Sequence, residues 1–125
     1  MINLILMTAR ELEGEFSIIG SNQNESDVNY RGVLTLELDK NDRFIAKWLI
    51  QDEQEQIGSG FFKDNILVIN FQYLGENSEI FNGVVVYRCL TKDILDGFWS
   101  EEQGDPKFLG TERCFRINKD ITLTD

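Results

Sequence analysis

The sequence contains no histidine, one proline, two cysteines and no long apolar run. The lack of histidine excludes histidine general bases, serine–histidine and cysteine–histidine dyads, and histidine-ligated metals. No stretch approaches the 18 consecutive apolar residues of a membrane-spanning helix. Two cysteines without a Cys-x-x-Cys pair are too few for a disulfide framework, so a reducing compartment, the cytoplasm, is the expected location.

Basic residues are also scarce. Lys and Arg number 12 against 22 Asp and Glu, which gives a net charge of −10. Such a field repels phosphate backbones and anionic lipid head groups, so neither nucleic acid nor a membrane surface is an expected partner. The 125 residues suffice for one domain, and 42% hydrophobic residues are typical of a globular chain.

Apolar residues recur with a period of two, which is the pattern of half-buried strands. Leu34, Leu36 and Leu38 alternate with polar side chains, and Phe44 and Trp48 repeat the pattern after a turn rich in Asp and Asn. The eight predicted strands are 14–20, 30–38, 43–51, 56–62, 66–73, 81–90, 94–100 and 109–117. Residues 52–55 are expected to form an acidic turn.

Short links between consecutive strands require antiparallel pairing. Eight such strands can hide their edges in two stacked sheets or in a closed barrel, and we favour an all-β, eight-stranded antiparallel up-and-down barrel. Residues 14–20 then lie alongside 109–117. The whole chain, 1–125, is expected to be one domain: an N-terminal turn or short helix (1–12), the barrel (13–118) and a tail (119–125). Residues 1–10 lack the basic start and the length of a signal peptide.

Gly14-Glu15-Phe16, at the start of the first strand, resembles the Gly-x-aromatic motif of calycins, the superfamily of lipocalins, fatty-acid-binding proteins and avidins. The resemblance implies that a basic residue of the last strand, Arg113 or Arg116, packs over Phe16 in a cation–π contact. Biotin binding is not expected, because the Asn that avidins carry ahead of their Gly-Ser pair and their Trp-rich later strands are absent.

Further motifs, in order over residues 12–117, resemble a group of small bacterial barrel proteins, some of which are labelled fibronectin-binding. The motifs are Gly20-Ser21-Asn22, Tyr30-Arg31-Gly32, Phe44 to Trp48, Gly58-Ser59-Gly60, Asn65-Ile66-Leu67, Gly83-Val84-Val85-Val86-Tyr87, Leu95-Asp96-Gly97-Phe98-Trp99 and Gly110-Thr111-Glu112. This resemblance implies the calycin-like barrel and no settled activity. Glycines repeated within strands also indicate bends or close approach of neighbouring groups.

The candidate ligand-binding residues are Tyr30, Trp48, Tyr87, Trp99 and Glu112. The two tryptophans either belong to the core or form an aromatic wall for a flat or apolar ligand. The tyrosines can direct their hydroxyls into a cavity. The alternation leaves open which face of the last strand carries Glu112. An interior carboxylate needs a partner, for which Tyr30, Arg88 and Arg116 are candidates, and it either belongs to a structural pair or orients a ligand.

No catalytic residue, metal site or cofactor is expected. The adjacent acids Glu101-Glu102 and Asp52-Glu53 are interpreted as solvated turns, and Asp39-Lys40-Asn41-Asp42 lacks the Gly and distal Glu of a calcium loop. Cys89 and Cys114 fall two strands apart, roughly 9.6 Å, which is beyond disulfide reach.

The sequence favours a non-enzymatic barrel that binds a small, mostly apolar ligand in its interior. The alternative is a protein-interaction module or homodimer that uses an apolar outer face, with Val33, Ile45, Leu49 and either Ile66 with Val68 or Leu67 with Ile69. An enzyme such as a cyclase or isomerase is a third possibility that lacks an identifiable acid–base pair.

Overall fold

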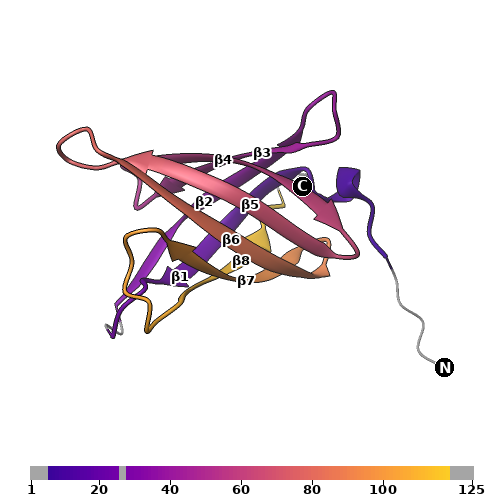
Figure 1. Cartoon of the computed structure of the whole chain (residues 1–125). Coiled ribbons are helices and arrows are strands. Elements are labelled where there is room, and N and C mark those ends of the chain that lie inside the picture. The colour runs from indigo at the N-terminus through magenta and orange to yellow at the C-terminus, as the bar shows by residue number, and fades with distance from the viewer. Residues whose placement is uncertain (1–5, 26–27, 119–125) are drawn as a thin grey trace, which may run out of the picture.

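The computed structural model describes residues 6–25 and 28–118 and shows a closed barrel of eight antiparallel strands in sequence order (Figure 1). Its elements are η1 (Ala9–Leu12), β1 (Gly14–Ser21), β2 (Asn29–Leu38), β3 (Phe44–Ile50), β4 (Gln54–Lys63), β5 (Ile66–Leu74), β6 (Ile80–Thr91), β7 (Ile94–Glu101) and β8 (Gly110–Arg116). β1 pairs with β8 from Phe16 opposite Arg116 to Ser21 opposite Thr111. The predicted closure of the barrel is therefore confirmed.

The turns between strands are tight. Asp64 and Asn65 both have positive φ and link Lys63 to its partner Ile66, as a two-residue turn that matches the twist of the strands requires. The turn between β3 and β4 is shorter than predicted. Gln51 and Asp52 adopt positive φ, so β4 begins at Gln54, and the prediction of a turn over 52–55 was wrong by two residues at its end.

The interior follows the predicted alternation. Seventeen buried apolar residues form one cluster: Leu12, Phe16, Ile18, Tyr30, Leu34, Leu36, Phe44, Ala46, Trp48, Leu67, Ile69, Phe71, Val85, Tyr87, Cys89, Leu95 and Cys114. On β5 the side chains of Leu67 and Ile69 face inward, so Ile66 and Val68 are the outward pair. The helix content of the described residues is the four-residue 3-10 turn η1, and no helix there is long and apolar enough to cross a bilayer.

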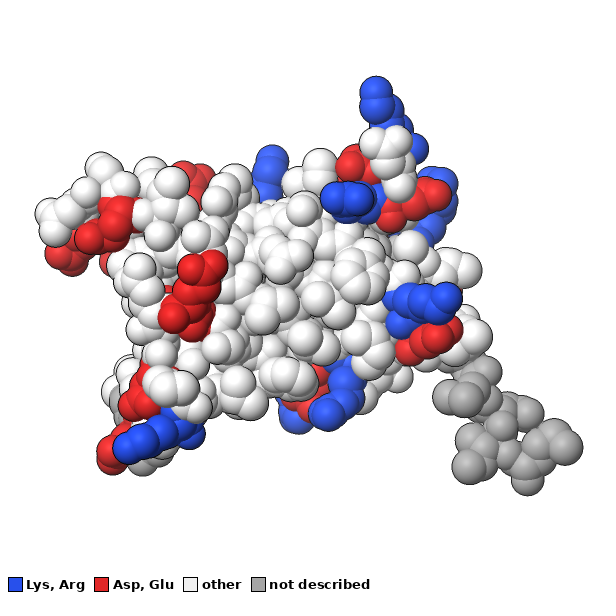
Figure 2. Space-filling model, in the orientation of Figure 1, with Lys and Arg blue, Asp and Glu red and all other residues white. Residues whose placement is uncertain are grey.

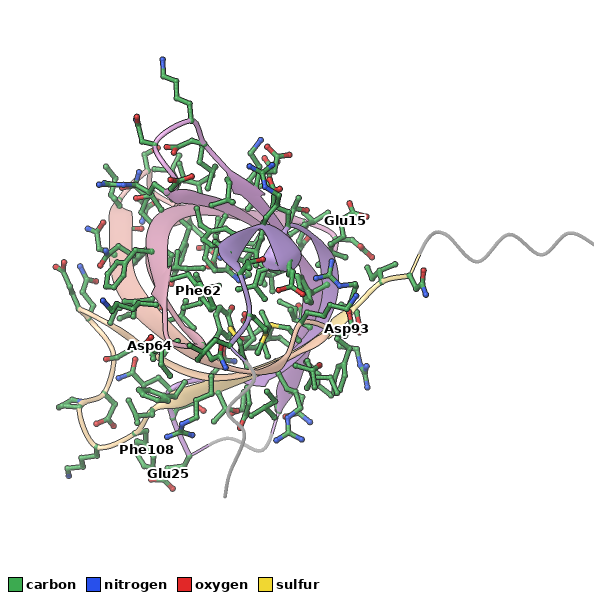
Figure 3. The ribbon with its side chains drawn as sticks, turned by 90° about the vertical axis from the view of Figure 1, so that its right-hand side faces the viewer. Glu15, Glu25, Phe62, Asp64, Asp93 and Phe108 are labelled. Carbon is green, nitrogen blue, oxygen red and sulfur yellow. The ribbon has the colours of Figure 1, made fainter. Side chains whose placement is uncertain are left out.

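The end of the barrel beside η1 is closed. Leu12 is fully buried, and η1 lies across the ring of strands when the barrel is viewed from this end (Figure 3). Arg116 donates hydrogen bonds to the main-chain oxygens of Glu11, Glu13 and Lys92 at 2.7–2.8 Å and pairs with Asp93 at 2.7 Å. One residue of the last strand thus fastens the N-terminal segment over the barrel.

The same arginine makes the contact that the calycin resemblance implies. The Arg116 guanidinium lies 4.7 Å from the centre of the Phe16 ring. Arg113, the other candidate, faces outward and pairs with Asp96 at 3.5 Å. Gly14, with φ +136°, leaves room for the guanidinium, because a Cβ there would lie 2.4 Å from Nη1.

The loops β1–β2, β3–β4, β5–β6 and β7–β8 gather at the opposite, open end. Their described residues carry seven acidic side chains and one basic side chain: Glu25, Asp52, Glu53, Glu76, Glu79, Glu102 and Asp105 against Lys107. The closed end carries Glu11, Glu13, Asp39, Asp42, Asp64 and Asp93 together with Arg10, Lys40, Arg43 and Lys92. Figure 2 shows blue and red side chains interleaved at that right-hand end. The predicted tail, 119–125, lies outside the described residues.

The outer face over β4–β7 is largely uncharged. Phe61, Val68, Val86 and Phe98 are consecutive register partners, so they form an apolar row across four strands. Phe61 is 58% exposed, and the area around the row is broad and white in Figure 2. Monomeric proteins rarely expose contiguous apolar patches of this kind unless they are used for contact.

Candidate functional site

The barrel interior is not completely filled. A cavity of about 280 Å³ opens at the end opposite η1. Its lining comprises Asn22, Tyr30, Trp48, Ile50, Gln51, Gln54, Gln56, Phe71, Tyr73, Val85, Trp99, Glu101 and Glu112. The volume lies just below the range of about 300–1,000 Å³ typical of drug-sized sites, so the space suits a smaller ligand.

Each of four interior rings lies over a glycine of the neighbouring strand. The register pairs Tyr30 with Gly20, Phe71 with Gly83, Tyr87 with Gly97 and Trp99 with Gly110. A Cβ added to any of these glycines would lie 2.0–2.5 Å from the facing ring. The glycines that interrupt the strands in the sequence therefore make space for the rings of the cavity wall and of the layer behind it.

Glu112 projects from β8 into the floor of the cavity and is 5% exposed. Tyr30 donates its hydroxyl to Oε1 at 2.7 Å. Oε2 accepts the indole N–H of Trp48 at 3.1 Å and the hydroxyl of Tyr87. The question that the sequence left open is thus settled: Glu112 faces inward, and its partners are two phenols and an indole rather than Arg88 or Arg116.

Burial raises the pKa of Glu112 above its ordinary value, and the hydrogen bonds from Tyr87, Tyr30 and Trp48 partly oppose the rise. Burial and the nearby Glu112 charge also raise the pKa values of Tyr30 and Tyr87. Both phenols therefore remain protonated donors at physiological pH. The cluster is a carboxyl group held by neutral donors, and none of its hydrogen-bond donors is a protein cation.

Aromatic rings form the side of the cavity. Phe71 meets Trp48 edge to face at 5.9 Å between ring centres and meets Trp99 in the same manner at 6.2 Å. Tyr73 stacks on Phe71 at 6.5 Å, closer to the mouth. Because rings in such contacts support one another, the wall is held in place before any ligand arrives.

The indole N–H of Trp99 is buried and has no hydrogen-bond partner among the described residues. The indole lies close enough to the Tyr30 hydroxyl for a weak hydrogen-bond interaction, which lowers the pKa of Tyr30 slightly against the larger effect of burial. A buried donor without a partner is uncommon and costs about 1–3 kcal/mol.

Hydrogen bonds fix the rim of the cavity. Tyr73 donates its hydroxyl to Glu101 at 2.7 Å. The buried amide of Gln23 accepts the main-chain N–H of Glu101 at 3.0 Å and donates to Ser100 and to the main-chain oxygen of Asp105. These bonds tie the β1–β2 and β7–β8 loops together, so Glu101 is positioned at the mouth.

The structure brings the predicted site residues together. Tyr30, Trp48, Trp99 and Glu112 line the cavity, whereas Tyr87 is fully buried and reaches it only through its bond to Glu112. Phe71, Tyr73 and Glu101 also line the cavity, although the sequence did not predict them as site residues. Phe71 and Tyr73 share the inward face of β5 with Leu67 and Ile69, so the alternation already contained the signal for them.

The cysteines do not belong to the site. Cys89 and Cys114 are free and buried, and both are register partners of Leu95, which places them two strands apart as predicted. Burial raises the pKa of Cys89 to about 12 and that of Cys114 well above its ordinary value, so neither is a reactive thiolate. Within 6–25 and 28–118 no group of three acidic or cysteine side chains could hold a metal ion.

The chain matches no protein-family model and no curated protein sequence. Its fold resembles solved structures of redesigned β-barrels. The barrel b11L5F_LGL aligns with a TM-score of 0.73 at 11% identity, over 93% of this chain and 100% of that one. The barrel mFAP1, bound to DFHBI, aligns with a TM-score of 0.66 at 16% identity, over 86% and 97%. At such identities the likeness establishes the up-and-down barrel fold alone.

Proposed function

We propose that this protein is a non-enzymatic barrel that binds a small molecule in the cavity at its open end. The observation that carries the proposal is an open cavity of about 280 Å³ lined by Trp48, Phe71 and Trp99 above the buried carboxyl of Glu112. Concave sites that combine aromatic side chains with convergent polar groups are typical ligand sites. The similar redesigned barrels mFAP1 and mFAP0, both bound to DFHBI, support the proposal as examples of this fold with a small ligand.

The groups of the site favour holding a ligand over transforming it. Both oxygens of Glu112 accept hydrogen bonds from protein groups, which limits their use in proton transfer to a substrate. The thiols are neutral and lie outside the cavity lining. The calycin relationship also remains a proposal, supported by the contact of Arg116 with Phe16.

The two tryptophans provide the test, because the chain has only Trp48 and Trp99 and both line the cavity. A panel of one-ring and two-ring aromatic compounds of positive, neutral and negative charge is titrated while the two indole N–H resonances are followed by NMR. Binding in the cavity is expected to shift both resonances. A panel in which no compound shifts either resonance would contradict the proposal.

A blocking variant sharpens this test. Gln56 lines the cavity from β4, and Gln56→Phe is expected to fill it and abolish the shifts. Gln72→Phe is the matched control, since Gln72 is exposed on the outer face of β5 and should leave binding unchanged. Equal binding by the two variants would place the ligand outside the cavity.

The second candidate function is association of two copies through the outer face of β4–β7. The apolar row of Phe61, Val68, Val86 and Phe98 favours it. A two-fold pair would bring this same row together from both copies. Sedimentation of the native chain and of Phe61→Lys tests the idea: a dimer that Phe61→Lys dissociates supports it, and a monomer at all concentrations contradicts it.

A further inference from the structure

The cavity wall has charge of one sign only. Its described lining contains two carboxyl groups, those of Glu112 at the floor and Glu101 at the rim, and contains no Lys or Arg. The remaining polar side-chain groups are the amides of Asn22, Gln51, Gln54 and Gln56, the hydroxyls of Tyr30 and Tyr73, and the indole N–H groups of Trp48 and Trp99. An anionic ligand would find no counter-charge in this wall.

The mouth of the cavity adds to this asymmetry. The described residues of its loops include Glu25, Asp52, Glu53, Glu76, Glu79, Glu102 and Asp105 against one basic residue, Lys107, and the chain as a whole has a net charge of −10. A cleft lined by charge of one sign focuses the field and raises the local concentration of ions of the opposite sign. Cations are therefore drawn to this end of the barrel and anions are repelled.

The aromatic wall has the same preference. The faces of Trp, Tyr and Phe rings are negative and attract ammonium groups, most strongly where water is excluded. Trp48, Phe71, Tyr73 and Trp99 present several such rings around one small volume. A wall of rings without carboxylates would suit a neutral ligand, but here the rings and the carboxyl groups occupy the same cavity.

The surroundings of Glu112 also favour a positively charged ligand. Its hydrogen-bond donors are the neutral side chains of Tyr30, Trp48 and Tyr87. A buried carboxylate that lacks a positive partner is costly in a medium of low dielectric constant. A positively charged ligand would provide the counter-charge that the described residues of the cavity do not.

We propose that the ligand is a small organic cation, a protonated amine or quaternary ammonium on a flat apolar body. This inference rests on the proposed function. The apolar body packs against Trp48, Phe71 and Trp99, and the charged group faces the carboxyl groups of the cavity. The cavity of about 280 Å³ restricts the ligand to a compact molecule with one or two rings.

Three probes of nearly equal size distinguish the contribution of the charge to binding from that of the aromatic ring. They are 2-phenylethylammonium, 2-phenylethanol and phenylacetate. Their dissociation constants are measured by following the two indole N–H resonances. The ammonium is expected to bind about tenfold more tightly than the alcohol, with an affinity that falls as salt is added, and phenylacetate is expected not to bind. Equal binding of ammonium and alcohol would overturn the cation inference and leave the proposed function standing. Failure of these three together with the whole panel would contradict both.

Variants that each remove one negative charge test whether the preference for the ammonium depends on the carboxyl groups of the cavity. Glu101→Gln keeps an acceptor for the Tyr73 hydroxyl. It is expected to weaken binding of 2-phenylethylammonium about three- to tenfold and to leave the affinity for 2-phenylethanol unchanged. Glu102→Gln is the matched control, because Glu102 is exposed, lies outside the cavity lining and changes the net charge equally. Glu112→Gln should have a larger effect if it folds. Equal effects of Glu101→Gln and Glu102→Gln would overturn the assignment to the cavity.

Discussion

The two ends of this barrel use the same strands for different purposes. At the closed end, η1, Leu12 and the contact of Arg116 with Phe16 fill the interior, and acidic and basic residues are mixed in the loops. At the open end, the rings leave a cavity, the loops are nearly all acidic, and a carboxyl group lies buried without a protein cation as its partner. We interpret the closed end as the part that stabilises the fold and the open end as the proposed ligand site.

The largest effect on stability is expected at the closed end. Leu12→Ala removes a fully buried side chain and should lower the free energy of unfolding by about 2–5 kcal/mol. Urea denaturation measures it. Leu6→Ala is the control, since Leu6 is 59% exposed and its loss should cost less than about 0.5 kcal/mol. Equal costs for the two would contradict the account of η1 as a packed closure.

A smaller effect is expected where a ring of the cavity wall lies on a glycine. A Cβ at Gly110 would lie 2.0 Å from the Trp99 ring, so Gly110→Ala should displace that ring and cost about 1–3 kcal/mol. The indole resonance of Trp99 should shift with it. In a Trp99→Leu background most of this cost should disappear, which a double-mutant cycle measures. An unchanged cost would show that the glycine is needed for another reason.

Glu112 should make stability depend on pH with a defined sign. Its pKa is higher in the folded than in the unfolded protein, so its favourable contribution is complete below its ordinary pKa and is lost as pH rises through the folded value. Glu112→Gln should therefore gain stability relative to the native chain as pH rises from the ordinary pKa of a glutamate toward the raised folded value, by about 1.4 kcal/mol for each unit of the difference in pKa. Urea midpoints over this range provide the test. A difference that is independent of pH would contradict it.

The smallest effect is expected at the rim. Tyr73→Phe removes the hydroxyl that bonds Glu101 at 2.7 Å in a half-buried setting, and it should cost about 0.5–1 kcal/mol. Its larger consequence should be weaker binding of 2-phenylethylammonium, because Glu101 would be less well positioned. A loss of stability as large as that of Leu12→Ala would contradict the distinction between the two ends.

Much of the fold could be predicted because each strand alternates and each link is short. That pattern specifies the antiparallel order and shows which residues of each strand share a face, but it left open whether the face of Phe71 in β5 points inward. The turn between β3 and β4 could not be placed, because Gln51 and Asp52 adopt positive φ without a glycine to signal it.

The candidate site was harder to predict because it depends on contacts between distant strands. Glu112 lies in a stretch where both faces are mixed, so only the closed register shows that it meets Tyr30 and Trp48. Glu101 was interpreted as part of a solvated turn together with Glu102. The bond from Tyr73 and the main-chain bond to Gln23 distinguish Glu101 from its neighbour, and local sequence contains neither.

The most direct test of the difference between the two ends is a crystal structure of the protein grown with 2-phenylethylammonium. We expect electron density for the probe within the open-end cavity, with its ring against Trp48, Phe71 and Trp99 and its ammonium group toward a carboxyl group of Glu112 or Glu101. A cavity that side chains fill, or a probe bound only on the outer face, would contradict it.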